Sequence, residues 1–331
     1  MKVFIIAEAG VNHNGDLGLA LKLCDVAKTA GVDAVKFQTF KTENILTKNV
    51  PMASYQKKNL QSNINQFDMI KSLELSFGDF VKIKKHCGKL GIEFMSTPDD
   101  DESLDFLVKL GLKKIKIGSG DVNNISFLRK VGAKKLDVIM STGMSTVSDI
   151  GKAYKTLISS GARSVSILHC TTNYPCPMEE VNLKVLLDLQ RKFKTKIGYS
   201  DHTTGIEVAI SAVALGATII EKHFTLDKNM VGPDHKASLD VDELRQMVYQ
   251  IRNIEKALGN GIKRITKSEI RISKLVRKNL VALRYIKKGE KFTNKNVTTK
   301  RANGGISARD WDKVIGKTAR KDFREDEIIK L

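Results

Sequence analysis

Eight short apolar runs, each ending in a polar or ionisable residue, are spaced along the first 225 residues of the chain. Their sequences are VFIIAE (3–8), AVKFQ (34–38), IEFMST (92–97), KIKIGS (114–119), VIMST (138–142), VSILHC (165–170), KIGYSDH (196–202) and TIIEKH (218–223). Each run is followed by a segment with helical periodicity, such as LGLALKLCDVAKTAGV after the first. This alternation predicts an α/β fold, a (β/α)8 TIM barrel, whose chemistry lies at the carboxyl ends of the strands.

The pattern changes near the C-terminus, which predicts a second module. The barrel is expected to span residues 1–261, because an amphipathic helix after the eighth run is closed by glycine. Polar residues 262–274 predict a linker, and the short strands and turns of 275–331 predict a compact β-rich module that is too small for a deep core of its own. The longest connection, residues 39–75, lies on the expected catalytic rim, where such loops often serve as a lid or a partner contact.

Charge, hydropathy and cysteine content narrow the class of protein. The formal net charge is +19, but the lysines are spread along the whole chain and aromatic residues make up only 6%, so a solvated basic surface is favoured over nucleic-acid binding. No apolar run approaches the roughly 18 residues that span a bilayer. Glu8 interrupts the N-terminal apolar run too early for a signal peptide, and the four cysteines lack zinc-site spacing. These features predict a cytoplasmic enzyme without a membrane or nucleic-acid partner.

Polar residues at neighbouring strand ends predict an anion site. Lys36 and Gln38 differ by two positions and therefore point to the same side of one strand, as do Glu221 and His223 in a later strand. Each hydroxyl is a weak signal alone, because serine and threonine at strand ends often only cap helices. Convergence from several strands favours a pocket for a phosphate or carboxylate. The residues expected around this anion are Lys36, Thr97, Lys116, Ser119, Ser141 and Ser200.

Two histidines at adjacent strand ends, His202 and His223, favour a metal site with open coordination positions. The alternative is that one or both only form hydrogen bonds in the pocket, which is the usual role of an isolated histidine. Asp201 and Glu221 stand next to the two histidines and are the expected partners that orient them.

The strand-end motifs resemble those of the sialic acid synthase family. The matching segments, in collinear order, are AEAGVNHNGD (7–16), AVKFQTFK (34–41), MSTP (95–98), KIKIGSGD (114–121), STGM (141–144), LHCTTNYPCP (168–177), GYSDHT (198–203) and EKHFTLDKNMVGPDH (221–235). The segment from VRKNLVA to DEIIKL is similar to that family's antifreeze-like (SAF) domain. The resemblance covers nearly the whole chain.

The resemblance implies an enzyme that joins phosphoenolpyruvate to the open-chain form of an N-acetylated hexosamine. The product would be N-acetylneuraminate or legionaminate, depending on whether the acceptor is N-acetylmannosamine or its 2,4-diacetamido-2,4,6-trideoxy analogue. Phosphate would leave with C–O cleavage, and a divalent ion, Mn²⁺ first with Mg²⁺ or Co²⁺ as alternatives, would bind at His202 and His223. The residues NHNG argue against pseudaminate as the product. The sequences of the segments AEAGVNHNGD and GPDHKASL slightly favour legionaminate.

The resemblance also assigns roles to individual residues. Phosphoenolpyruvate would be held by Lys36, Thr97, Lys116, Ser119, Ser141, Thr172 and Ser200. The sugar would be held by Glu8, Gln38, Tyr174, Asp234 and Arg301. The catalytic set would be Glu8, Lys36, Lys116 and His223. A domain-swapped homodimer is implied as well, in which Arg301 of one subunit reaches the acetamido group of the sugar held by the other.

The chain departs from the family pattern at several positions. Thr172 stands where some members have asparagine, Asp99 replaces the aromatic residue of STPF, Asp121 replaces the glutamate of GSGE, and RANGG replaces RPGNG. Two other readings stay open. One is a different phosphoenolpyruvate-dependent 3-deoxy-sugar phosphate synthase, which needs a further basic cluster for a phosphorylated acceptor. The other is a non-catalytic antifreeze-like scaffold, which does not account for the lysines and histidines at the strand ends.

Overall fold

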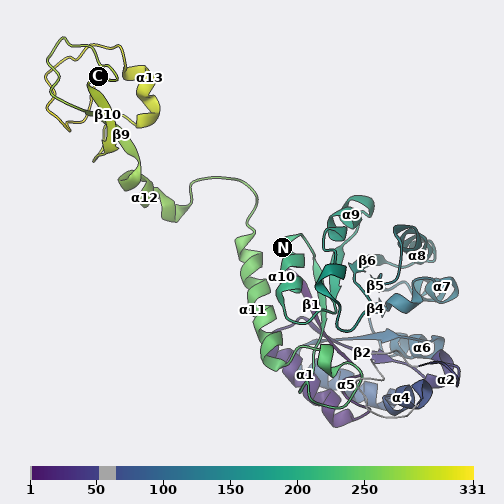
Figure 1. Ribbon diagram of the computed structural model, residues 1–331. Helices are drawn as coiled ribbons and strands as arrows, with labels where there is room; N and C mark the ends of the chain where they lie inside the picture. Colours follow the sequence, from purple (N-terminus) through teal and green to yellow (C-terminus); the bar gives the residue numbers. More distant parts are fainter. Residues whose placement is uncertain (1, 52–64) are drawn as a thin grey trace. The chain divides into compact units, whose positions relative to one another are not determined.

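The computed structural model describes residues 2–51 and 65–331, and the chain divides into two compact units, Met1–Gly259 and Asn260–Leu331 (Figure 1). The first unit contains one sheet of eight parallel strands in the order β3-β2-β1-β8-β7-β6-β5-β4. Its end strands β3 and β4 also contact each other, so the sheet curls into a barrel. The strands are β1 Phe4–Gly10, β2 Ala34–Thr39, β3 Glu93–Pro98, β4 Lys114–Ile117, β5 Asp137–Ser141, β6 Ser164–His169, β7 Ile197–Asp201 and β8 Ile219–His223. The predicted (β/α)8 barrel is confirmed.

Helices follow the strands as the periodicity predicted. They are α1 Leu17–Ala30, α2 Thr42–Ile45, α4 Gln66–Ser72, α5 Phe77–Leu90, α6 Asp101–Lys109, α7 Ile125–Ala133, α8 Val147–Ser159, α9 Val185–Lys192, α10 Glu207–Ala214 and α11 Val241–Ala257. Local signals set their limits: α1 begins where Asp16 accepts a hydrogen bond from the Leu19 amide and ends at Gly31, whose φ of 82° suits glycine. The predicted rim connection 39–75 contains α2 and α4, and its residues 52–64 lie outside the described part. None of the helices in residues 2–51 and 65–331 is long and apolar enough to cross a bilayer.

Alternation along the strands separates two apolar layers. Side chains such as Ile5, Val35 and Ile115 point outward and pack against the helices in the main core. A smaller cluster fills the barrel interior, and its members are Ile6, Ala34, Met95, Ile139, Leu168 and Ile219. This inner cluster forms an apolar floor below the carboxyl ends of the strands.

The C-terminal unit has a separate small core. It contains α12 Lys267–Val276, the antiparallel pair β9 Lys278–Ala282 and β10 Val297–Arg301, and the short helix α13 Trp311–Val314. Leu280, Phe292 and Phe323 are fully buried at its centre. The predicted β-rich module is confirmed. The division after Gly259 precedes the predicted boundary at 261, and α12, none of whose residues is buried, occupies part of the stretch predicted as a linker.

Candidate active site

A polar chamber lies directly above the apolar floor of the barrel. Two residues beyond most floor positions, the inward side chains become polar: Glu8 follows Ile6, and Lys36 follows Ala34. The chamber has a volume of about 190 Å³. It is lined by Glu8, Lys36, Gln38, Thr97, Asp99, Lys116, Gly118, Ser119, Gly120, Ser141, Thr172, Tyr174, Ser200, His202, Glu221 and His223. The structure therefore brings together the whole predicted anion set and both predicted metal ligands.

Four buried charged groups form the centre of the chamber. Lys36 Nζ lies 2.7 Å from Glu8 Oε2 and 3.7 Å from Glu221 Oε2, and it donates to Thr97 Oγ1 at 3.1 Å. Lys116 Nζ lies 3.4 Å from Glu221 Oε1. Strand register places these groups side by side, since Glu8 pairs with Lys36 across β1 and β2. Two carboxyl groups thus share two ammonium groups, and all four side chains are buried.

The two carboxyl groups have opposite acidities. Burial raises the pKa of Glu8 to about 7, although the Lys36 ammonium opposes the rise. Burial also acts on Glu221, but Lys116 and Lys36 outweigh it and lower the pKa of Glu221 to about 2. Burial lowers the pKa of Lys116, whereas the pKa of Lys36 is raised because Glu221 and Glu8 outweigh its burial. Of these two carboxyl groups, Glu8 is therefore the one that can take up and release a proton near neutral pH.

Hydroxyl groups line the side of the chamber formed by β4 to β7. Lys116 Nζ donates to Ser141 Oγ at 2.6 Å, and Ser200 Oγ donates to Glu221 Oε1 at 3.0 Å. Ser119 Oγ accepts from the Gly143 amide at 2.9 Å. A Cβ at position 143 would come within 2.0 Å of Thr172 Oγ1, so glycine is needed for this close approach. Within the described residues Thr172 Oγ1 is buried without a hydrogen-bond partner, which leaves a hydroxyl free for a ligand.

The two histidines lie together at the ends of β7 and β8. Their ring centroids are 5.7 Å apart, and the Tyr174 ring lies 4.2 Å from that of His202 and 5.6 Å from that of His223. Burial lowers the pKa of both imidazoles, so both are neutral at physiological pH. His202 Nδ1 donates to the Thr171 carbonyl at 2.7 Å, which leaves Nε2 as the basic nitrogen, and His223 Nδ1 has no partner among the described residues. His202 Nε2 lies 3.5 Å from Ser200 Oγ. Neutral imidazoles of this kind suit a divalent transition ion.

No group of three or more His, Cys, Asp or Glu side chains in the described part of the chain could enclose a metal ion. The predicted supporting role of Asp201 is wrong, because this residue points to the outer side of β7. Its carboxylate lies 2.8 Å from Lys222 Nζ, and both side chains are fully buried. Two histidines alone match an open site at which substrate or water would supply further ligands.

The residues predicted to hold the sugar are only partly gathered at the chamber. Gln38 Nε2 donates to Glu8 Oε1 at 3.4 Å, and Tyr174 lines the wall. Asp234 is buried in the loop after β8, where burial raises its pKa to about 6, but it does not line the chamber. Arg301 is exposed at the end of β10 in the C-terminal unit, and its role stays a prediction.

Two chamber residues were given other roles by sequence reasoning. Asp99 was noted only as a departure from the family's STPF pattern, and Glu221 was expected only to support a histidine. Both line the chamber, and Glu221 contacts both lysines. The signal that identifies them is the two-residue period of a strand: Asp99 follows the inward Thr97, and Glu221 follows the inward Ile219.

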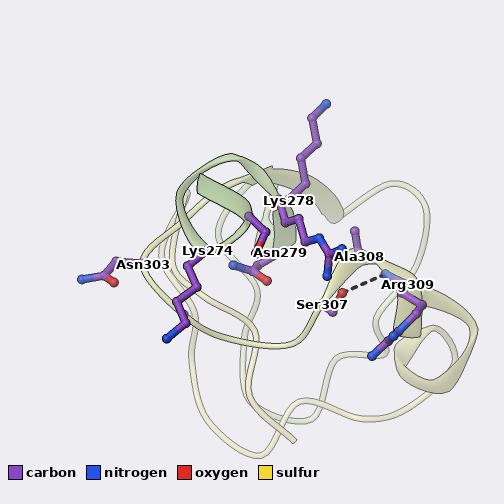
Figure 2. Close-up of a pocket in the computed structure, with 10 residues that line it drawn as sticks. Lys274, Lys278, Asn279, Asn303, Ser307, Ala308 and Arg309 are labelled. Atoms are coloured by element: carbon purple, nitrogen blue, oxygen red, sulfur yellow. Dashed lines mark hydrogen bonds between the residues drawn. The ribbon is translucent and has the colours of Figure 1, made fainter. Parts of the chain in front are cut away.

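A second cavity lies within the C-terminal unit and has a volume of about 720 Å³ (Figure 2). Its basic side chains are Lys274, Arg277, Lys278 and Arg309, and Figure 2 shows Lys274 and Lys278 extending in different directions. Ser307 Oγ accepts from the Arg309 amide at 3.3 Å. The cavity has no carboxyl or imidazole group in its lining, so it lacks the acid and base groups that the barrel chamber combines.

Comparisons with known proteins agree with this geometry. The NeuB family model matches residues 23–263, and the SAF domain model matches residues 277–331. An N,N'-diacetyllegionaminic acid synthase from Campylobacter jejuni is 49% identical over 331 residues, covering 99% of each chain. An N-acetylneuraminate-9-phosphate synthase from Homo sapiens is 33% identical and covers 98% of this chain and 91% of its own. A crystal structure of an N-acetylneuraminic acid synthetase from Leptospira borgpetersenii, in complex with citrate, superposes with a TM-score of 0.72 at 35% identity, covering 82% of this chain and 90% of the other. The chain belongs to the NeuB family and ends in a SAF domain.

Proposed function

We propose that this protein is a nonulosonate synthase that condenses phosphoenolpyruvate with an open-chain N-acetylated hexosamine and water. The observation that carries the proposal is the composition of the barrel chamber. It combines two buried lysines, two neutral histidines and the Thr172 hydroxyl group, which has no hydrogen-bond partner among the described residues. The 49% identity to a diacetyllegionaminic acid synthase favours the 2,4-diacetamido-2,4,6-trideoxy analogue of N-acetylmannosamine as the acceptor. The products are then N,N'-diacetyllegionaminate and phosphate.

Phosphoenolpyruvate is proposed to bind on the side of the chamber formed by β2 to β7. Its phosphate and carboxylate need several cationic and hydrogen-bonding donors at once. Lys36 and Lys116 supply the positive charge, and the hydroxyl donors are Thr97, Ser119, Ser141, Thr172 and Ser200. When Glu8 takes up a proton, the four central groups keep two positive charges against one negative charge, which favours an anionic ligand.

The proposed reaction forms one C–C bond and one C–O bond. C3 of phosphoenolpyruvate attacks the aldehyde carbon of the sugar, and water adds to C2. The bond between C2 and the bridging oxygen then breaks, so that this oxygen leaves with phosphate. Glu8 is proposed to accept one proton of the added water, because its pKa of about 7 suits proton transfer near neutral pH. One proton goes to the former aldehyde oxygen, which becomes a hydroxyl group, and the second proton of the water leaves with phosphate as C2 becomes a ketone.

We propose that His202 and His223 hold a divalent ion, Mn²⁺ first as the family resemblance implies, with Mg²⁺ or Co²⁺ as alternatives. Imidazole ligands favour the transition ions Mn²⁺ and Co²⁺ over Mg²⁺. When bound, such an ion polarises the aldehyde oxygen as a Lewis acid. The protein's own part is to fix the ligands: the Thr171 carbonyl orients His202, and the Tyr174 ring packs against both imidazoles. The hydrogen bond to Thr171 fixes the tautomer of His202, and the contacts with Tyr174 restrict the orientation of both rings.

We also propose a homodimer in which Arg301 contacts the sugar held by the partner. Support comes from exposed apolar side chains on and before α12, which a second chain would cover. These are Ile262, Ile265, Ile270, Ile272, Leu275 and Val276.

The deciding experiment is turnover in water enriched in ¹⁸O. The protein is mixed with phosphoenolpyruvate, Mn²⁺ and either N-acetylmannosamine or its diacetamido-trideoxy analogue, and phosphate and product masses are measured. We expect one ¹⁸O in the nonulosonate and none in the released phosphate, with the diacetamido sugar used best. Label in the phosphate would contradict C–O cleavage, and full activity after exhaustive chelation would contradict the metal assignment.

The two other readings have less support. A synthase for phosphorylated acceptors needs a basic cluster beside the chamber, but the pocket that adjoins it at Asp99 is lined by Asp100, Asp101 and Glu102. A non-catalytic scaffold leaves unexplained why two lysines are held in the barrel interior, where burial of a charge is costly.

A further inference from the structure

Asp99 stands at the boundary between the active chamber and a neighbouring pocket. It directly follows β3, and its amide donates to the Thr39 carbonyl at 3.1 Å, which holds it beside the end of β2. It lines the chamber with Lys36 and Thr97, and it also lines an outer pocket of about 440 Å³. A ligand that fills the chamber and extends outward past β3 must pass this side chain.

The Asp99 carboxyl group has no hydrogen bond or ion pair among the described residues. The next residue, Asp100, differs, because it caps α6 by accepting from the Ser103 amide at 2.9 Å. Lys36 is already paired with Glu8 at 2.7 Å and does not neutralise Asp99. Burial and the Asp121 carboxylate raise the pKa of Asp99 to about 8. A polar group in this setting needs a partner from a ligand or from water.

The surroundings of Asp99 define which ligand group fits. The outer pocket adds Asp100, Asp101 and Glu102, and its single lysine, Lys130, is already paired with Asp101. A phosphate in this place would meet carboxyl groups without a free cation among the residues that line the pocket. A hydroxyl or an amide N–H has no charge and can donate to a carboxyl oxygen.

We infer that Asp99 is a specificity-determining residue that accepts a hydrogen bond from an uncharged part of the acceptor sugar and rejects acceptors carrying a phosphate. The inference rests on the proposed function and adds the class of acceptor to it. It also separates this chain from its human relative, an N-acetylneuraminate-9-phosphate synthase at 33% identity. Specificity of this kind works partly through repulsion of the wrong substrate.

The test compares kcat/KM for N-acetylmannosamine, its 6-phosphate and the diacetamido sugar in the wild type and three variants. We expect the wild type to prefer the uncharged acceptors at least 100-fold. Above pH 8, where the Asp99 carboxyl group is ionised, Asp99→Asn should reduce this preference at least tenfold, because it removes the charge and keeps the shape. Below that pH the wild-type preference should itself become smaller, because Asp99 takes up a proton. Asp99→Leu should raise KM for the uncharged acceptor at least tenfold. In both Asp99 variants KM for phosphoenolpyruvate should stay within threefold.

Asp101→Asn is the matched control, because Asp101 lines the outer pocket but not the chamber. It should keep the wild-type preference, and an equal change in this variant would assign the effect to the general field of the pocket. If an active wild type and Asp99→Asn show the same preference above pH 8, the inference is wrong while the proposed function stands. If the wild type releases no phosphate with any acceptor, the proposed function is wrong and the inference falls with it. Circular dichroism and a separate measurement of phosphoenolpyruvate binding show that each variant is folded.

Discussion

Lys116 shows how a single residue can serve binding at the expense of stability. Its side chain is buried, burial lowers its pKa, and its carboxylate partner Glu221 is 3.4 Å away and shared with Lys36. Removing an ammonium group from water costs free energy that such a partly shared partner does not fully restore. A charge held in this way is typical of a site prepared for an anionic ligand.

The first prediction concerns Lys116→Met, which keeps the length of the side chain and removes the charge. Turnover should fall at least 100-fold, about 2.7 kcal/mol of transition-state stabilisation, because an ammonium group next to Ser141 is lost from the anion site. The thermal unfolding temperature should not fall, since a buried charge is removed. Steady-state kinetics and a thermal melt check the two halves, and a large loss of stability would contradict the interpretation.

For individual residues, the sequence predicted which side chains line the site better than it predicted how they interact. Lys36, Lys116 and the hydroxyl residues could be identified because each ends an apolar run at an inward position. The raised pKa of Glu8 and the shared role of Glu221 could not, because both depend on distances between strands that are not adjacent in the sequence. The two-residue period of a strand could have identified Asp99 as an inward residue, because it lies two positions after Thr97. Its motif was compared only with the family pattern.

Individual strands carry different chemistry on their two sides. On β7 and β8, Ser200 and Glu221 face the chamber, whereas Asp201 and Lys222 face outward and form a fully buried ion pair. Asp201 also accepts from the amide and the hydroxyl of Thr203 at 2.9 and 2.8 Å. The outward pair therefore joins two strands to the turn after β7, and the inward residues serve the ligand.

The second prediction concerns Lys222→Met, which leaves the buried Asp201 carboxylate without its cation. We expect a loss of about 3–5 kcal/mol in the free energy of unfolding, the usual cost of breaking a buried pair from one side. Urea unfolding measures it. The double variant with Asp201→Leu should recover part of the loss, because no unpaired charge remains, and a single variant as stable as the wild type would contradict the role of the pair.

The third prediction concerns Glu74, which binds the start of the rim connection after β2. Its carboxylate accepts from the Thr42 amide at 3.0 Å and from Lys41 Nζ at 3.0 Å, and Lys71 Nζ is 3.1 Å away. Burial would raise its pKa, but these partners outweigh burial and lower the pKa to about 2. Glu74→Gln should therefore cost about 2 kcal/mol near neutral pH, the scale of hydrogen bonds to a charged group.

The effect of Glu74 should depend on pH in one direction. The folded-state pKa lies below the ordinary value of about 4.3, so the stabilisation is complete above that value and is lost as the pH falls toward 2. The difference between wild type and Glu74→Gln in urea should narrow below about pH 4. Glu93→Gln is a control, since the Glu93 side chain is 40% exposed and forms a surface ion pair with Lys114. It should change stability by less than about 1 kcal/mol.

The eight strands were predicted almost residue by residue because apolar β-branched runs bounded by polar residues leave little choice. The helices of the rim connection were not predicted, because α2 and α4 are short and are held by contacts with residues distant in the sequence, such as Glu74. The assignment of Asp201 to the histidines was wrong for a related reason. Neighbours in a strand point to opposite sides, so proximity in sequence to His202 indicated the wrong partner.

The whole molecule combines a catalytic barrel with a module that has its own core. The change of pattern near residue 275 predicted two units, but α12 was taken as part of a linker because its composition is polar. A capping box marks its start, as Thr266 accepts from the Glu269 amide and the Glu269 side chain accepts from the Thr266 amide. That signal was present in the sequence and outweighs composition.

The fourth prediction tests whether Arg301 acts on the partner subunit. Arg301→Ala should raise KM for the sugar more than KM for phosphoenolpyruvate. Mixing this variant with Lys116→Met after dissociation should restore roughly a quarter of wild-type activity, because half of randomly formed dimers carry one complete site out of two. No recovery in verified mixed dimers would place Arg301 in its own subunit's site or in no site.

The inner floor formed by Ile6, Ala34, Met95, Ile139, Leu168 and Ile219 makes the chamber a dead end. Reactants and products then share the opening at the carboxyl ends of the strands, because these apolar side chains pack in the barrel interior below it. A nonulosonate that lingers at this opening obstructs the next phosphoenolpyruvate molecule. Product release through this opening, as well as bond formation, can therefore limit the rate of the catalytic cycle.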